Sequence, residues 1–82
     1  MDRFHALTAF ARVVEAGSFA GAAARLGVSV SSVSRAVADL EAHLDARLLN
    51  RTTRRLSLTE TGQAFFERCV QLLADLEEAE IR

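Results

Sequence analysis

Residues 18–44 read SFAGAAARLGVSVSSVSRAVADLEAHL, and this stretch holds two helical apolar patterns separated by a very short turn. Ser18 and Ser29 each stand just before one of these patterns. Serine is favoured there because its hydroxyl oxygen accepts a hydrogen bond from a free backbone N–H in the first helical turn. Gly27 lies between the patterns, where a left-handed residue ends the earlier helix. So short a connection makes the two helices cross steeply, as in a helix-turn-helix.

The later of these two helices is expected to have two different sides. Apolar residues recur at helical spacing and predict a continuous inward face, formed by Val33, Val37, Leu40 and Leu44. The opposite side is small and hydroxylated and carries a single cation; it consists of Ser31, Ser34, Arg35 and Ala38. A flat polymer surface could therefore come close to the backbone of this helix.

Further elements are expected before and after this stretch. A first helix is predicted to begin after an N-cap at Asp2 and to end at Gly17. After Leu44 the helical period ends, and Leu56 and Leu58 show the two-residue alternation of a strand, so residues 47–51 and 56–58 are predicted to form two short strands of a hairpin. Thr59 is expected to cap a long final helix.

Together these patterns predict a mainly α fold. It is a winged helix-turn-helix, with a three-helix core and a two-stranded wing, over residues 1–58, followed by a long linker and dimerisation helix over residues 59–82. A single small core of this size is only marginally stable, so support from a second subunit is expected. The final helix carries two apolar stripes, of which one can pack on the first helix and the other is left for another chain. The residues expected at the dimer interface are Phe65, Cys69, Leu72, Leu76 and Ala79.

Charge is distributed unevenly along the chain, whose net charge is −1. Residues 25–58 hold six arginines against three acids, whereas residues 59–82 hold two arginines against six acids. Phosphate binding depends on the local field of the basic segment rather than on the total charge. All ten cations are arginines, which suit bidentate contacts to phosphates and bases.

The outward side of the predicted recognition helix is the first candidate for contact with double-stranded DNA, because the first turns of such a helix face base edges in the major groove. The residues in question are Ser29, Val30, Ser31, Ser34 and Arg35. Arg35 can bind guanine O6 and N7 or hold a phosphate, whereas Val30 offers only van der Waals contact, for example to a thymine methyl group. The alternatives are that the serines only cap and solvate the helix and that Arg35 pairs with Asp39.

The tip of the predicted hairpin is the second candidate. It consists of Arg51, Thr52, Thr53, Arg54 and Arg55. A wing of this kind can place one arginine in the narrow minor groove and others on phosphates. The alternative is a basic turn that only keeps the edge of the hairpin soluble.

Other classes of function have less support in the sequence. Cys69 is the only cysteine, so we expect no internal disulfide, no zinc site and no cofactor. His5 and His43 have no neighbouring nucleophile, so no enzyme is predicted. The chain shows no signal-peptide pattern and no membrane-spanning apolar run, which favours a cytoplasmic protein without membrane contact. A helical module that binds only proteins stays open, because the acidic final helix suits other partners, but it leaves the hairpin arginines unexplained.

Four segments resemble the DNA-binding domain of LysR-type transcriptional regulators, and together they span most of the chain. They are AFARVVEAGSFAGAA at residues 9–23, LGVS at 26–29, VSRAV at 33–37 and RTTRRLSLTETG at 51–62. The resemblance implies a bacterial regulator that binds an interrupted palindromic promoter site as a homodimer or a pair of dimers. It also implies a C-terminal effector-binding domain, which these 82 residues do not contain and through which alone a small-molecule effector would act.

The resemblance also assigns roles to particular residues. The base-reading positions fall on Val30, Ser31, Ser34 and Arg35, and the wing arginine on Arg54. The family usually has glutamine at the position of Val30, so an apolar contact is expected to replace a hydrogen bond to a base. It usually has glycine at the position of Asp45, and aspartate tolerates the left-handed conformation better than most residues.

Overall fold

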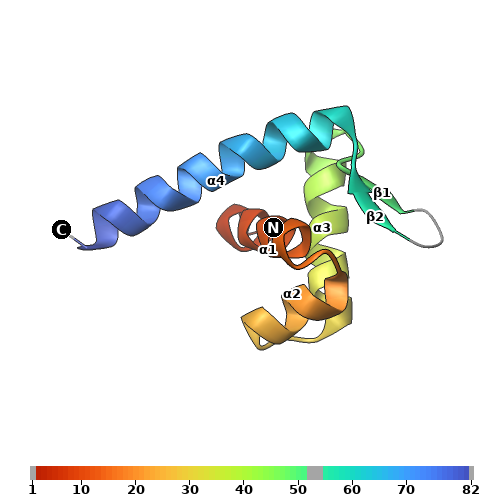
Figure 1. Cartoon of the computed structure of the whole chain (residues 1–82), viewed down its shortest axis with the longest axis horizontal. Coiled ribbons are helices and arrows are strands. Elements are labelled where there is room, and N and C mark those ends of the chain that lie inside the picture. The colour runs from red at the N-terminus through yellow and green to blue at the C-terminus, as the bar shows by residue number, and fades with distance from the viewer. Residues whose placement is uncertain (1, 52–54, 82) are drawn as a thin grey trace.

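The computed structural model describes residues 2–51 and 55–81 and shows a three-helix core, a hairpin and a long last helix (Figure 1). The elements are α1 (Arg3–Ala16), α2 (Phe19–Leu26), α3 (Val30–Leu44), β1 (Leu49–Arg51), β2 (Leu56–Leu58) and α4 (Glu60–Ile81). The two strands form an antiparallel sheet. In Figure 1 the hairpin and α4 extend from the same end of α3 in opposite directions. The expected mainly α architecture with a two-stranded wing is confirmed.

The helices begin and end at the capping residues that the sequence predicts. Ser18 Oγ accepts from the Gly21 N–H at 2.9 Å, and Ser29 Oγ accepts from the Ser32 N–H at 3.1 Å. Gly27 ends α2 with φ at +68°, in the left-handed region that glycine adopts without a steric penalty. Asp45 ends α3 with φ at +51° and is the only non-glycine residue with a positive φ among the residues that the structure describes.

The core lies where α1 crosses the helix-turn-helix. α1 packs against α2, α3 and α4, and Phe10 at its centre is fully buried. The inward side of α3 is buried as expected through Val33, Val37 and Leu40. Leu44, which was expected to continue this side, is the last residue of α3 and is 37% exposed. The buried face of α3 therefore ends one turn earlier than its sequence pattern predicts.

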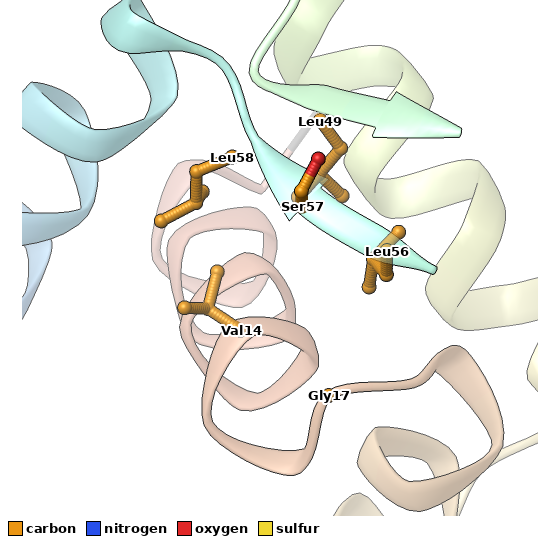
Figure 2. A pocket seen from close by; sticks show the side chains of 6 residues that line it. All are labelled: Val14, Gly17, Leu49, Leu56, Ser57 and Leu58. Atoms are coloured by element: carbon orange, nitrogen blue, oxygen red, sulfur yellow. The ribbon is translucent and has the colours of Figure 1, made fainter. Parts of the chain in front are cut away.

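The hairpin packs one face on α1 and turns the other to solvent. Its register pairs Leu49 with Leu58 and Asn50 with Ser57. Leu49 is buried and Leu58 half-buried, and both line a small apolar hollow of about 170 Å³ beside Val14 of α1 (Figure 2). The strand expected from residue 47 begins only at Leu49. The reason is that Leu48 forms its backbone hydrogen bonds outside the hairpin, with Glu41 and Thr59.

The first half of α4 belongs to the core. Thr59 caps this helix, since its Oγ1 accepts from the Gly62 N–H at 2.8 Å. The ring of Phe65 lies 5.8 Å from that of Phe10, centre to centre, and Cys69 has no exposed surface. Burial raises the pKa of the Cys69 thiol from 9.0 to about 11, because a thiolate would lose its hydration there.

Packing within the chain covers part of the expected dimer interface. Cys69 is completely enclosed within its own chain, and Phe65 is half-buried against the same core. Cys69 therefore offers no exposed surface to a second subunit, whereas a contact through Phe65 stays a prediction. Both lie on the predicted apolar stripe, but α1 covers the stripe along the first half of α4, so only its later members remain exposed.

Candidate nucleic-acid interface

The first turn of α3 presents both apolar and hydroxyl groups to solvent. Val30 is 48% exposed, and Ser31 is also exposed. The hydroxyl groups of Ser29 and Ser31 lie 3.2 Å apart and share a hydrogen bond. Ser29 is the N-cap of α3, which is the capping role that the sequence offered as an alternative to DNA contact. Ser31 lies on the solvent-exposed side of the turn.

The second turn of α3 carries Arg35, the cation on the outward side of this helix. Arg35 is exposed, and no ion pair joins it to Asp39 in the part of the chain that the structure describes. Ser34 is half-buried. A guanidinium group on the solvent side of a helix keeps its donors available for bidentate contacts. The outward side expected from the sequence is therefore present at Val30, Ser31 and Arg35, and only in part at Ser34.

Arg51, the last residue of β1, is exposed but is held by two contacts. Its Nη2 lies 3.2 Å from Glu41 Oε1, and its Cζ lies 5.4 Å from the centre of the Phe19 ring. Its side chain is 36% exposed and lies on the same face of β1 as Leu49, two residues earlier. Arg55 is exposed. The remaining candidates of the hairpin, Thr52, Thr53 and Arg54, lie outside the described residues.

Glu41 is a residue that the sequence interpretation missed. Its Oε2 accepts from the backbone N–H groups of Leu48 at 2.8 Å and Leu49 at 3.2 Å, and its side chain is 12% exposed. The sequence did contain a signal, because Glu41 lies one residue after the apolar Leu40 of the inward face of α3. The sequence analysis gave Glu41 no role and assigned Arg51 to the DNA-contacting tip of the hairpin.

The outward side of α3 and the base of the hairpin form one continuous surface. A shallow, mostly polar hollow lies between them, lined by Ala38, Glu41 and Ala42 of α3 and by Arg47 and Arg51 at the hairpin. Ala38 is the next outward position after Ser34 and Arg35 along the helix. A ligand that lies along α3 would therefore also meet the base of the wing.

Exposed apolar side chains continue along the second half of α4. Leu72 is 53% and Leu76 38% exposed, and both lie on the stripe that began with Phe65 and Cys69. Ala79 is exposed on the same stripe, and Val70 is exposed beside it. These residues form an apolar surface that the described chain does not cover.

Residues 2–51 and 55–81 contain neither a metal-binding cluster nor a membrane-spanning helix. No group of three or more histidine, cysteine, aspartate or glutamate side chains is placed to hold a metal ion there. None of the helices in this part of the chain is long and apolar enough to cross a membrane.

The fold and this surface define the class of protein: a winged helix-turn-helix domain with an exposed recognition helix. Residues 4–63 match the profile of the family described as "Bacterial regulatory helix-turn-helix protein, lysR family". The match covers most of the chain, so this protein belongs to the LysR family of bacterial regulators, as its sequence motifs indicated.

The relatives with assigned roles include both a repressor and an activator of transcription. An HTH-type transcriptional repressor of Pseudomonas aeruginosa is 52% identical over 80 residues, which are 98% of this chain and 25% of the relative. The HTH-type transcriptional activator AaeR of Escherichia coli is 44% identical over 78 residues, 95% of this chain and 25% of AaeR. The chain thus spans about a quarter of the length of these relatives.

A solved structure that resembles the chain over most of both molecules is a DNA complex. The structure of the BenM DNA-binding domain with the catB site 1 DNA superposes with a TM-score of 0.91 at 32% sequence identity. The superposition covers 96% of this chain and 87% of that one. The arrangement of helices and wing described above is therefore the arrangement of a domain that has been observed on DNA.

Proposed function

We propose that this chain binds double-stranded DNA in a sequence-specific manner as the DNA-binding domain of a transcription regulator. In this proposal α3 lies in the major groove and reads base edges through Val30, Ser31, Ser34 and Arg35. The wing lies against the backbone and the adjacent minor groove. The observation that carries the proposal is the single surface that joins the exposed first turns of α3 to the base of the wing.

The partners follow from the same arrangement. We propose that two chains associate through Leu72, Leu76 and Ala79 on α4, which are exposed at helical spacing. A two-fold dimer places its recognition helices in successive major grooves, so the target is an interrupted palindrome in a promoter. Pairs of such dimers and a small-molecule effector belong to the complete regulator, with the effector acting through a C-terminal domain.

The proposal also covers the cellular setting. DNA binding places the protein in the cytoplasm, at the nucleoid, and no catalytic step is proposed for it. The relatives are named as transcriptional regulators, which agrees with this role.

The strongest rival is a helical module that binds only proteins, supported by the uncovered apolar stripe and the acidic residues of α4. The two functions differ in salt dependence. Each phosphate contact releases counterions, so the affinity for a duplex falls steeply as salt rises. A module without phosphate contacts shows no such slope on DNA.

The test begins with selection of binding sites from random duplexes, followed by titration of the 82-residue chain over a range of NaCl concentrations. Arg35→Ala is expected to cost about 1–3 kcal/mol, mainly at one base position, because one bidentate contact to guanine is lost. Arg68→Ala on α4 is the matched control, since it removes the same charge from an exposed position far from α3. Salt-independent binding by the wild type, or selection that returns no consensus, would contradict the proposed function.

A further inference from the structure

The base of the wing is held from two sides. Glu41 of α3 accepts hydrogen bonds from the backbone N–H groups of Leu48, at 2.8 Å, and of Leu49. From the other side, the Thr59 N–H donates to the Leu48 carbonyl oxygen at 3.0 Å, and Thr59 Oγ1 donates to the Arg47 carbonyl oxygen at 2.7 Å. The peptide groups around Leu48 are thus fixed to both α3 and the start of α4, immediately before β1 begins.

The two oxygens of Glu41 have separate partners. Oε2 accepts the hydrogen bonds of both backbone N–H groups, whereas Oε1 lies 3.2 Å from Arg51 Nη2. Leu48 and Leu49 are fully buried, so their N–H groups cannot turn to water instead. The carboxylate therefore has two separate roles: it hydrogen-bonds to the backbone at the base of the wing, and it forms an ion pair with Arg51.

Arg51 is confined on a second side as well. The ring of Phe19 lies 5.4 Å from its Cζ, in the range of a cation–π contact. The contacts with Phe19 and Glu41 direct its guanidinium group to α2 and α3, although the side chain is still 36% exposed. A cation that is paired with a carboxylate in this way contributes little to counterion release on a duplex.

We propose that Glu41 is a positioning residue for DNA binding: it fixes the wing against the recognition helix and holds Arg51 away from the phosphates. This inference rests on the proposed function, and it reassigns Arg51 from a DNA contact to part of the joint between α3 and the wing. The orientation of the wing is set by the carboxylate that α3 itself supplies, so the major-groove and minor-groove elements move as one body.

Three variants separate the backbone hydrogen bonds of Glu41 from its ion pair with Arg51. Glu41→Gln keeps an oxygen that can accept the two backbone N–H groups, but places an amide against Arg51. Glu41→Ala removes both contacts, and Arg51→Ala removes the cation while leaving the backbone contacts in place. Each variant is titrated with the selected duplex at several salt concentrations and examined by hydroxyl-radical footprinting, which reports the wing and α3 at different positions on the DNA.

Glu41→Ala is expected to bind at least ten times more weakly and to lose the wing's protection while keeping that of α3. Glu41→Gln should retain both protections, with an affinity within threefold of the wild type. Arg51→Ala should leave the slope of log K against log salt unchanged, whereas loss of a phosphate contact reduces the magnitude of this slope by about 0.9.

Three results would overturn the inference: an intact wing footprint in Glu41→Ala, loss of that footprint in Glu41→Gln, or a smaller salt slope in Arg51→Ala. Circular dichroism shows whether each variant folds. If Glu41→Ala does not, the other two variants still decide the question. Failure of the proposed function is distinct, because the wild type itself would then give no footprint on the selected duplex.

Discussion

Val30, the first residue of α3, is 48% exposed and apolar, so it can give no hydrogen bond to a base. In the major groove the apolar group available to a valine is the C5 methyl group of thymine. Among the exposed residues of this turn, Val30 is therefore the one expected to select for a methyl group.

Replacement of one thymine by deoxyuridine tests this role on the selected duplex, because the change removes only the methyl group. At the position read by Val30 the affinity should fall about fourfold, which corresponds to about 0.8 kcal/mol for one buried carbon. The affinity is measured by fluorescence anisotropy at constant salt. Val30→Ala should bind both duplexes nearly equally. If no thymine in the half-site shows this dependence in the wild type, Val30 does not recognise a methyl group.

Individual residues also show what sequence reasoning could and could not supply. Ser18, Ser29 and Thr59 were predicted as caps from local chemistry alone, and each accepts the backbone hydrogen bond expected of a cap. Arg51 was assigned to the exposed tip because it stands in a basic run. Its contact with Glu41 joins residues ten positions apart through the packing of the hairpin on α3, which a linear pattern does not display.

At the scale of elements, the close approach of α4 to the base of the wing depends on a glycine. Gly62 is buried, and a Cβ at this position would collide with the carbonyl oxygen and carbon of Leu48. Backbone atoms cannot rotate away as a flexible side chain can. The same peptide group is already fixed by Glu41 and Thr59, so α4 itself would have to shift.

Gly62→Ala is expected to destabilise the domain by about 1–3 kcal/mol, as overpacking in a tight contact does. At an open helical position the same change would stabilise by up to about 1 kcal/mol, because alanine favours the helix. Urea unfolding followed by circular dichroism measures the difference. Thr61→Ala, at the exposed neighbouring position, is the control and should change stability little. A Gly62→Ala variant more stable than the wild type would contradict the contact described here.

Element boundaries were predictable where a capping residue marks them and less so where tertiary bonds compete. The connection from α2 to α3 was expected from Gly27 and Ser29. The start of β1 was not, because the sequence of residues 47–51 does not reveal that the Leu48 N–H donates to Glu41. The position of the hairpin tip in space stays a prediction, since residues 52–54 lie outside the described part.

At the scale of the whole molecule, α4 is covered along its first half and uncovered along its second. The apolar stripe passes from the buried Cys69 to Leu72, which is 53% exposed. The sequence predicted the stripe, but the point at which the core ends depends on the length of α1 and its placement. The division at residues 58 and 59 into a DNA-binding unit and a dimerisation unit likewise stays a prediction.

Leu72→Asp is expected to convert a dimer into single chains, because a carboxylate would be buried without a partner in the interface. Light scattering should then give a mass near 8.9 kDa, against twice that value for the wild type. Ala74→Asp adds the same charge at an exposed position on another side of α4 and should leave the dimer intact. A wild-type mass of one chain, or an unchanged mass in Leu72→Asp, would remove this stripe from the interface.

The two-sided construction of α3 has a consequence for how such regulators diversify. The buried residues of this helix are Val33, Ala36, Val37 and Leu40, while Val30, Ser31 and Arg35 are exposed. Under the proposed function, we expect exchanges at the latter positions to change the preferred operator while leaving the packing of the core intact. After gene duplication, a copy can thus acquire a new set of promoters through a few substitutions, without passing through an unstable intermediate.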